Sequence, residues 1–508
     1  MRPIRKVLVA NRGEIAVRIL HALREMRIAS LALRSDADRD ALHAQLADDV
    51  ADLPGESADQ TYLNVDRILA LCRERGVDAV HPGYGFLAEN ADFADACAQA
   101  GVTFIGPSPQ ALRTLGDKLL AKSAMATAGV STIPGWSGHL QTNESEIAQQ
   151  AQSIGYPILV KAAAGGGGKG MRRVNGPDEL TQAWRAAARE AQNAFGDARV
   201  FLEKCLDGAR HVEVQIFGDA EGGALHLFER DCSIQRRHQK IIEESPCPAL
   251  SPQTRERMTA AALKAAQAVG YHGAGTVEFL LTPQDDFYFL EVNARLQVEH
   301  PVTEAVTGVD LVHAQLLTAQ GLPPGFSQET LTTRGHAIEC RICAEDPARG
   351  FLPVTGEIKV FRPPVIPGVR VDSGVQTGDR VTPHYDSMLA KVIVHAPSRA
   401  QALARMRAAL DDFVILGVTT NLPLLQAILV DDAFTKGRYD TSFLSHRPDL
   451  LSPDGLADHP EDPRLALAAV IAAHAPSAQS SSKRTGGPVS PWRDNEGWRL
   501  GATGSQLP

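Results

Sequence analysis

The residues best placed to do chemistry lie in two apolar stretches, TVEFLL and FYFLEVNARL, each of which is typical of a β-strand. Glu291, Asn293 and Arg295 alternate with apolar residues, so they point to one face of their strand. If that strand pairs with residues 276–281, Glu278 lies beside Glu291. Two carboxylates and an amide oxygen form a ligand set for Mg²⁺ or Mn²⁺, and without a cation the two acids would repel each other. The alternative is an exposed polar sheet face.

A further carboxylate, Glu299, follows this strand in the sequence QVEHP. An acid just beyond a metal-binding strand could act as a general base, and a loop acid satisfied by its neighbours fits the pattern equally well. Arg295 carries a planar guanidinium, which suits a small oxyanion.

A basic cluster stands in ERDCSIQRRHQKIIEE, residues 229–244. Its cationic members are Arg230, Arg236, Arg237, His238 and Lys240. In an acidic chain such a cluster indicates a site for an anion such as phosphate. A solvated, charged edge strand is the competing interpretation.

Four consecutive glycines, 165–168, follow Lys161 at the end of the apolar run YPILVKAA. The Walker pattern fails here, because Ala163 and Gly170 stand where that pattern needs glycine and a hydroxyl residue. A second strand, MRRV, follows the glycines, so we predict a long hairpin tip. Lys161, at a strand end just before this loop, is well placed to meet phosphate.

Three other residues, at two places in the sequence, could contact a nucleotide. Lys118 in LGDKLLAK is a single lysine of the kind that usually lies on the surface. Glu203 and Lys204 end the apolar strand FLEK, where an acceptor and a donor could read an adenine edge.

The elements that must position these residues begin with an α/β unit. The pattern of a buried strand occurs in residues 6–10, in residues 28–33 and in a segment that ends near His81. Between the first two, residues 14–26 have the pattern of a helix. Such alternation predicts a parallel sheet whose strand ends, NRGE and HPGYGFLAEN, carry ligand loops. The first loop has a single glycine, Gly13, so the dinucleotide-binding fingerprint is absent.

The rest of the chain is rich in strands up to about residue 445. Residues 211–219, 224–231, 273–281 and 287–296 are expected to be consecutive antiparallel strands, with further strands within 335–346 and 389–396. Beyond 448 we expect a loop, one helix over 464–475 and a linker.

Composition limits the partners. The 508 residues are 44% hydrophobic and 22% charged, with a net charge of −9 and no long basic run, which argues against nucleic acid. The odd number of cysteines, seven, fits reduced thiols. We interpret Cys340 and Cys343 as part of a buried strand, and a metal site is the alternative. With no signal peptide and no membrane-spanning apolar run, we expect a soluble, cytoplasmic protein.

Taken together, the motifs resemble those of the biotin carboxylases, which are ATP-grasp enzymes. The resemblance rests on GDK, ILVKAAAGGGGKGM, FLEK, RHVEVQ, ERDCSIQRRHQK, EFLL and LEVNARLQVEHPVTE, and on ANRGEIAVRI, HPGYGFLAEN, ECRICAED and HYDSMLAKVIV. They occur in order from about residue 5 to 444. The likeness is greatest to the biotin carboxylase part of acyl-CoA carboxylase α-subunits of the acetyl-, propionyl- or methylcrotonyl-CoA type.

The resemblance implies a fold and its divisions. The class is α/β (α+β): an N-terminal Rossmann-like parallel domain over 1–115, an ATP-grasp domain over 116–320 with a mobile glycine-rich lid at about 133–204, and a C-terminal antiparallel β-rich domain over 321–446. Residues 447–508 would be a linker and the start of a truncated further domain.

The resemblance also implies residue roles. ATP would be bound by Lys118, Lys161, Gly165, Gly166, Gly167, Gly168, Glu203, Lys204, Leu206, His211, Gln235 and His238. Bicarbonate would be bound by Arg295, Gln297 and Val298, biotin by Tyr84 and Arg341, and two Mg²⁺ or Mn²⁺ ions by Glu278, Glu291 and Asn293. The catalytic group would be Glu299 as base with Arg295, Arg341 and Lys240.

The implied reaction is ATP-dependent carboxylation of biotin with bicarbonate, through carboxyphosphate. The implied partners are a biotin carboxyl carrier, a carboxyltransferase subunit and a second copy of the chain in a homodimer or larger complex, with no nucleic acid or membrane. No methionine stands in the M-K-M motif of a carrier, so biotin is expected on another domain or chain. The alternatives are another ATP-grasp ligase, of the carbamoyl-phosphate or purine-pathway type, and an inactive scaffold.

Overall fold

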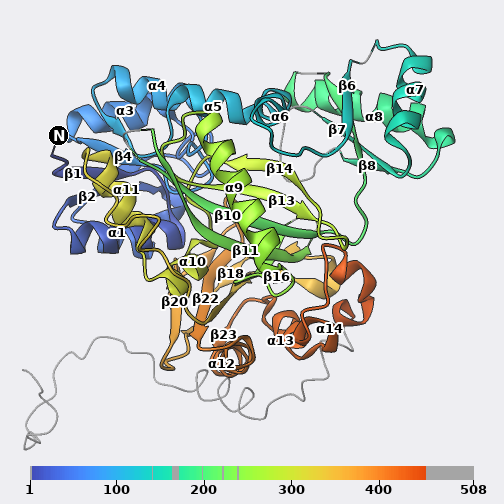
Figure 1. The fold of residues 1–508 in the computed structure, drawn as a ribbon. Coiled ribbons are helices and arrows are strands. Elements are labelled where there is room, and N and C mark those ends of the chain that lie inside the picture. The colour runs from blue at the N-terminus through green and yellow to red at the C-terminus, as the bar shows by residue number, and fades with distance from the viewer. Residues whose placement is uncertain are drawn as a thin grey trace, which may run out of the picture. The chain divides into compact units, whose positions relative to one another are not determined.

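The structure is a computed structural model that describes residues 3–139, 141–162, 171–196, 198–219, 222–236 and 239–452. The chain divides into two compact units, Met1–Pro460 and Glu461–Pro508, and every described residue belongs to the first. Three large sheets organise this unit (Figure 1). The predicted helix over 464–475 lies outside the described residues, as does nearly all of the predicted 447–508 segment.

The N-terminal sheet is parallel, with strand order β3-β2-β1-β4-β5. Its strands are β1 (Lys6–Val9), β2 (Ala29–Ser35), β3 (Asp49–Leu53), β4 (Ala79–His81) and β5 (Thr103–Phe104). The accompanying helices are α1 (Gly13–Glu25), α2 (Leu42–Leu46), α3 (Val65–Glu74), α4 (Ala91–Gln99) and α5 (Pro109–Gly116). The predicted parallel α/β unit is confirmed, and β3 and β5 are additional strands that the sequence pattern did not reveal.

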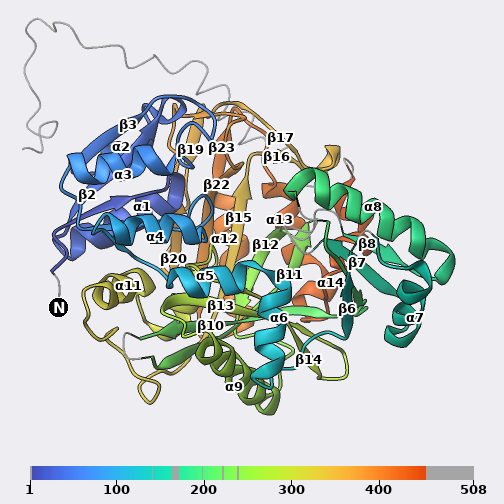
Figure 2. The same ribbon diagram turned by 90° about the horizontal axis from the view of Figure 1, so that it is seen from above.

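A smaller antiparallel sheet, ordered β6-β9-β7-β8, forms one end of this unit in both views (Figures 1 and 2). Its elements are β6 (Gly135–Gly138), β7 (Ile158–Ala162), β8 (Arg172–Val174) and β9 (Val200–Lys204), with α7 (Glu144–Ile154) and α8 (Pro177–Phe195). β7 pairs antiparallel with β8, so the predicted hairpin is confirmed, although its glycine tip lies outside the described residues. The buried ring of Trp184 packs against Trp136 beneath α8.

The largest sheet has eight strands in the order β14-β13-β10-β11-β12-β15-β22-β20. These are β10 (Arg210–Gly218), β11 (Ala224–Arg236), β12 (Gln239–Ser245), β13 (Gly273–Leu281), β14 (Phe287–Asn293), β15 (His336–Cys343), β20 (Val369–Ser373) and β22 (Met388–Ala396). The four predicted strands are present as β10, β11, β13 and β14 and pair antiparallel. They are not consecutive, however, because β12 and α9 (Pro252–Ala268) intervene in sequence and β10 lies between β11 and β13 in the sheet.

Helices cover both faces of this sheet (Figure 2). They include α6 (Lys118–Thr127), α10 (His300–Thr307), α11 (Leu311–Ala319), α12 (Arg399–Asp412), α13 (Leu422–Val430) and α14 (Asp432–Thr435). The short strands are β16 (Glu345–Asp346), β17 (Leu352–Pro353), β18 (Gly356–Glu357), β19 (Val360–Arg362), β21 (Arg380–Val381) and β23 (Val414–Leu416). Of these helices, α10 matters most here, because it packs against β11, β12, β15 and β22 and begins directly after Glu299.

Two sequence interpretations are decided by burial. The interpretation of residues 229–244 as a solvated edge strand was wrong, because β11 and β12 lie inside the sheet and most of their side chains are buried. Cys340 is buried and Cys343 half-buried in β15, as expected for a core strand. No helix among the described residues is both long and apolar enough to cross a membrane.

Glu244 on β12 connects the large sheet to α12. Its buried carboxylate accepts hydrogen bonds from Arg399 at 2.7 and 2.9 Å and from Tyr439, and lies 2.6 Å from Nε2 of His336. Burial alone would raise the pKa of Glu244, but the bonds to His336 and Arg399 outweigh it and lower the pKa from 4.5 to about 2. The folded state therefore binds this proton more weakly than the unfolded chain does.

We expect Glu244→Gln to destabilise the fold by about 3 kcal/mol at neutral pH. A depressed pKa contributes stability that is complete above the unfolded value of about 4.5 and is lost as the pH falls towards about 2. Thermal unfolding should therefore show a melting temperature several degrees lower at pH 7, with the gap to wild type narrowing in acid. Exposed Glu256→Gln is the control, and a gap that does not change with pH would contradict the assignment.

Candidate functional site

The centre of the site is a pair of carboxylates on neighbouring strands. In the β13–β14 register Glu278 is directly opposite Glu291, and Thr276 is opposite Asn293. The predicted juxtaposition of the two acids is therefore confirmed. Glu291 reaches solvent, yet partial desolvation raises its pKa and the charge of Glu278 raises it further. Glu278 already contacts Lys240 and His211, so the demand for a further positive charge lies at Glu291.

Asn293 and Arg295 lie beside this pair. Nδ2 of Asn293 donates to Oε1 of Glu278 at 2.7 Å, and its Oδ1 accepts from Nη2 of Arg295 at 3.2 Å. In this structure the amide thus presents nitrogen, not oxygen, to the acid pair, and it would have to turn over to ligate a cation. Arg295 also donates to Glu89 at 2.9 Å and to Oε1 of Gln297 at 3.1 Å.

The ammonium of Lys240, on β12, lies among three carboxylates. Its Nζ donates to Glu278 and to Glu299 at 2.7 Å each, and to Glu213. Burial by itself would lower the pKa of Lys240, but the three acids raise it well above its usual range. Lys240 is therefore a fixed positive charge that holds β10, β13 and the start of α10 together.

Behind this ammonium lies the fully buried side chain of Arg230. Its Nε donates to Glu213 at 2.6 Å, and its Nη atoms donate to Gln215 at 2.7 Å, to Thr303 at 2.9 Å and to Thr276 at 3.0 Å. All three nitrogens of Arg230 thus donate to protein groups, and this side chain holds Glu213 in place.

Glu299 is fully buried at the start of α10. One carboxylate oxygen accepts from Lys240 and the other from Nη2 of Arg341 at 2.8 Å. Burial would raise the pKa of Glu299, but Lys240 and Arg341 outweigh it and hold the pKa well below its ordinary range. Glu299 is therefore an ionised carboxylate with two cationic partners, as the alternative of a loop acid satisfied by its neighbours predicts. Through Lys240 it is also connected to Glu278 of the acid pair.

Two further polar residues, His211 and Gln235, are connected to Glu278. Nε2 of His211 lies 2.9 Å from Oε2 of Glu278, and its Nδ1 lies 2.7 Å from Nε2 of Gln235. Burial opposes protonation of His211, but the charge of Glu278 outweighs it and raises the pKa.

A second basic group lies where the small sheet meets α6. Glu203 is bridged by two lysines: Lys161 at 2.7 Å and Lys122, which the sequence did not single out, at 2.9 Å. Burial lowers the pKa of Lys118, and the charge of neighbouring Lys161 lowers it further, whereas Glu291 raises it. Lys118 therefore lies within electrostatic range of both Lys161 and Glu291.

The next predicted nucleotide contacts have different environments. Nζ of Lys204 donates to the carbonyls of Gly155 and Tyr156 at 2.9 Å each, and Leu206 is half-buried in the following loop. The side chains of Glu203 and Lys204 are thus already bound to protein groups, so the adenine edge would have to be read by other atoms of this segment.

The basic cluster of residues 229–244 does not form one anion site. Arg230 and Lys240 are bound by carboxylates, whereas Arg236 points elsewhere, to Glu345 at 2.9 Å and over the ring of Phe351. Residues 237 and 238 lie outside the described residues, as do the glycines 165–168.

Tyr84 and Val298 are linked through Glu14 and Lys391. The Tyr84 hydroxyl donates to Glu14, and Nζ of Lys391 lies 3.2 Å from the same carboxylate. Lys391 also donates to the carbonyl of Val298 at 2.6 Å. The predicted biotin residue Tyr84 and the predicted bicarbonate residue Val298 therefore belong to one chain of polar contacts.

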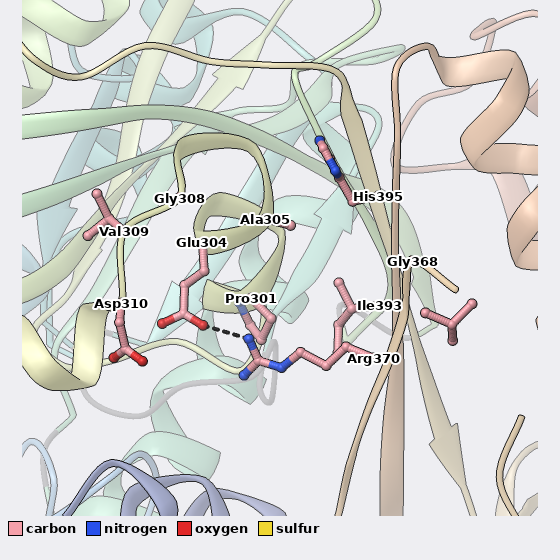
Figure 3. A pocket seen from close by; sticks show the side chains of 11 residues that line it. Pro301, Glu304, Ala305, Gly308, Val309, Asp310, Gly368, Arg370, Ile393 and His395 are labelled. Atoms are coloured by element: carbon pink, nitrogen blue, oxygen red, sulfur yellow. Dashed lines mark hydrogen bonds and ion pairs between the residues drawn. The ribbon is translucent and has the colours of Figure 1, made fainter. Parts of the chain in front are cut away.

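A separate hollow of about 400 Å³ opens beside the far half of α10 (Figure 3). Its charged lining is already paired: Glu304 with Arg18 at 3.0 Å and Arg370 at 2.8 Å, and Asp310 with Arg18 at 2.7 Å. It contains none of the predicted site residues, so its size alone does not mark it as the reactive site.

Several site residues escaped the sequence analysis. They are Glu14, Glu89, Lys122, Glu213, Glu243 and Lys391. A signal existed for Glu213, because HVEVQ alternates so that residues 211, 213 and 215 share one face. The others depend on contacts between distant segments.

Comparison with known families decides the relationship. Residues 3–112 match "Biotin carboxylase, N-terminal domain", residues 117–324 "Carbamoyl-phosphate synthase L chain, ATP binding domain" and residues 339–446 "Biotin carboxylase C-terminal domain". The biotin carboxylase of Nostoc sp. is 51% identical over 439 residues, which cover 86% of this chain and 98% of that protein. The chain belongs to the biotin carboxylase family. Its ATP-grasp fold class is thereby confirmed.

Other relatives of the chain are longer or structurally characterised. The mouse mitochondrial propionyl-CoA carboxylase α chain is 46% identical over 89% of this chain, which spans 62% of that protein. The biotin carboxylase domain of Hydrogenobacter thermophilus 2-oxoglutarate carboxylase, solved as a dimer with MgADP, ADP and bicarbonate, is 44% identical with a TM-score of 0.86 and covers 89% of this chain and 99% of that one. The flanking domain matches exclude a carbamoyl-phosphate or purine-pathway ligase.

Replacing the central ammonium should be destabilising in a pH-dependent way. In Lys240→Met, Glu213, Glu278 and Glu299 lose a shared counter-charge, so their pKa values rise and we expect a loss of about 3–5 kcal/mol of stability at neutral pH. The deficit should shrink as the pH falls, because the acids can then be protonated.

Thermal unfolding of Lys240→Met between acid and neutral pH tests this, with exposed Lys264→Met as the matched control. Equal melting temperatures of the two variants at neutral pH would show that Lys240 does not hold the acids together.

Proposed function

We propose that this chain carboxylates biotin, borne on a carrier, with bicarbonate and ATP, as the first half-reaction of a biotin-dependent carboxylase. Its family membership supports the reaction. The observation that carries the residue assignment is the contact of Glu299 with both Lys240 and Arg341, beside the acid pair. A carboxyltransferase would select the acyl acceptor.

Each group of residues takes one part of the reaction. ATP is bound by Lys118, Lys161, Glu203, Lys204, Leu206, His211 and Gln235, together with His238 and Gly165–Gly168 outside the described residues. Bicarbonate is bound by Arg295, Gln297 and the backbone of Val298, and biotin by Tyr84 and Arg341. The glycine-rich segment closes over the nucleotide as a lid and excludes water from the reactive intermediate.

Glu299 takes the proton of bicarbonate, and a bicarbonate oxygen attacks the γ-phosphate of ATP, giving carboxyphosphate and ADP. Carboxyphosphate breaks into CO₂ and phosphate, and the phosphate removes the proton from the ureido nitrogen of biotin. That nitrogen then captures CO₂, while Arg341 stabilises the negative ureido oxygen.

The low pKa of Glu299 in the ligand-free protein is compatible with this role. Together with Arg341 and Arg230, Lys240 keeps this carboxylate ionised and weakly basic. When phosphate oxygens of ATP draw Lys240 towards themselves, Glu299 loses a counter-charge and its pKa rises towards a useful range. Nucleotide binding thus prepares the base.

The residues fit a divalent cation. Glu278 and Glu291 are adjacent carboxylates with a raised pKa on Glu291, and Asn293 is within reach once its amide turns over. These three residues would hold two Mg²⁺ or Mn²⁺ ions, which neutralise phosphate charge when bound. Homodimerisation, which the dimeric relative supports, and docking of a carrier are further parts of the proposal.

The base assignment predicts the behaviour of Glu299→Gln. Bicarbonate-dependent ATP cleavage with free biotin, ATP and Mg²⁺ should fall by about 10²–10⁴-fold, because the proton has no acceptor. Phosphate release measures the rate, with Glu256→Gln as the control. Full activity of Glu299→Gln would refute the base role, and no turnover by wild type would refute the function.

The metal assignment predicts that Glu291→Gln weakens Mn²⁺ binding in the presence of nucleotide by about tenfold or more. Electron paramagnetic resonance of free Mn²⁺ gives the dissociation constant without requiring turnover. Binding should weaken for wild type as the pH falls through the raised pKa of Glu291, because protons compete for the carboxylate. An unchanged constant in Glu291→Gln would remove this residue from the ligand set.

A further inference from the structure

Two buried glutamates face each other behind Arg341, and the proposed mechanism uses neither of them. Glu243 on β12 is directly opposite Glu339 on β15, so both side chains lie on the same face of the sheet. Both are fully buried. Arg341, two residues beyond Glu339, shares this face and donates from Nε to Glu243 at 2.6 Å.

The oxygens of these two carboxyl groups differ in their hydrogen bonding. Oε1 of Glu243 is held by Arg341, whereas its Oε2 and both oxygens of Glu339 have no hydrogen-bond partner among the described residues. A buried acid left without partners is costly as an anion. Two such acids on adjacent strands can lower this cost by retaining one proton between them, as paired carboxyl groups do in other proteins.

Among the described residues, the two cations whose charge acts on Glu339 are Lys391 and Arg341, and both already contact other groups. Lys391 lies next to Arg341 in the β15–β22 register, but its ammonium donates to the carbonyl of Val298 and lies 3.2 Å from Glu14. Arg341 already contacts Glu243 and Glu299. A third carboxylate would leave this buried group with an excess of negative charge.

We propose that Glu243 and Glu339 form a carboxyl pair that shares one buried proton and acts as a positioning device for Arg341. Glu339 fixes Glu243 through that proton, and Glu243 in turn fixes the guanidinium beside Glu299. With one proton the pair carries a single negative charge, which balances Arg341 without drawing it away from biotin. This inference rests on the proposed function only for the role given to Arg341.

The surrounding charges agree with a retained proton. Burial raises the pKa of Glu243 to about 7, in spite of Arg341, and burial raises the pKa of Glu339 well above its usual range, in spite of Lys391. The charge of Glu299 raises both pKa values further, and that of Lys240 lowers the pKa of Glu243.

The helix packed on this face adds two further ionisable groups. In α10, burial holds the pKa of His300 well below its usual range, and Glu304 is paired with Arg18 and Arg370. Neither group supplies a positive charge to the pair.

Infrared spectroscopy detects the proton directly and does not depend on turnover. Wild type at about pH 7 should show the C=O stretch of a buried carboxylic acid, shifted in D₂O, and Glu339→Gln should lack it. Glu256→Gln, which removes an exposed carboxyl group, is the matched control and should keep the band. A band of equal intensity in wild type and Glu339→Gln would overturn the shared proton.

Kinetics with free biotin test the positioning role. Wild-type turnover should decline in alkali as the pair ionises, and this decline should move upward by about one pH unit or more in Glu339→Gln, which has no proton to lose. Glu243→Gln should raise KM for biotin by about tenfold with little change in KM for ATP, because only the guanidinium loses its support.

Equal rises in both KM values, or an alkaline limb that is the same in Glu339→Gln and wild type, would indicate a merely structural pair and overturn the proposal. If Glu339→Gln does not fold, Glu339→Met, which also lacks the carboxyl group, replaces it in both experiments. Absence of turnover in wild type would overturn the proposed function, and the infrared band would still decide the shared proton.

Discussion

The site depends on one interaction, the contact of the Lys240 ammonium with the carboxylates of Glu213, Glu278 and Glu299. Three buried acids cannot remain ionised at such short range without a shared cation, because each would otherwise take up a proton. The same ammonium joins three separate elements of the chain, so the folded geometry and the charge state of the site are determined together. Arg230 reinforces this arrangement from the core side by neutralising Glu213.

The large antiparallel sheet makes this clustering feasible. Its strand order places β13 and β14 at one edge and β15 and β22 near the other, and α10 packs against β11, β12, β15 and β22. Glu299 at the start of α10 can therefore contact Lys240 from β12 and Arg341 from β15. Arg341 in turn joins Glu299 to Glu243 on β12.

The sequence predicted those parts of the site that follow from local periodicity. The alternation of residues in LEVNAR and TVEFLL was enough to place Glu278 beside Glu291, because register in a hairpin follows from the strands and the turn. The parallel N-terminal unit and the hairpin around the glycines were predicted for the same reason. The position of β10 between β11 and β13 could not be predicted, because strand order depends on pairings between distant segments.

The partners of each charge were also beyond local reasoning. The cluster around Arg236 looked uniform in sequence, yet the sheet sends Arg230 and Lys240 to acids of the site and Arg236 to Glu345. Charges of one sign that are adjacent in a chain separate in space when each finds a buried counter-charge, because pairing lowers the cost of desolvation. An excess of acids over cations remains behind Arg341, and a retained proton is the simplest way for a closed core to restore the balance.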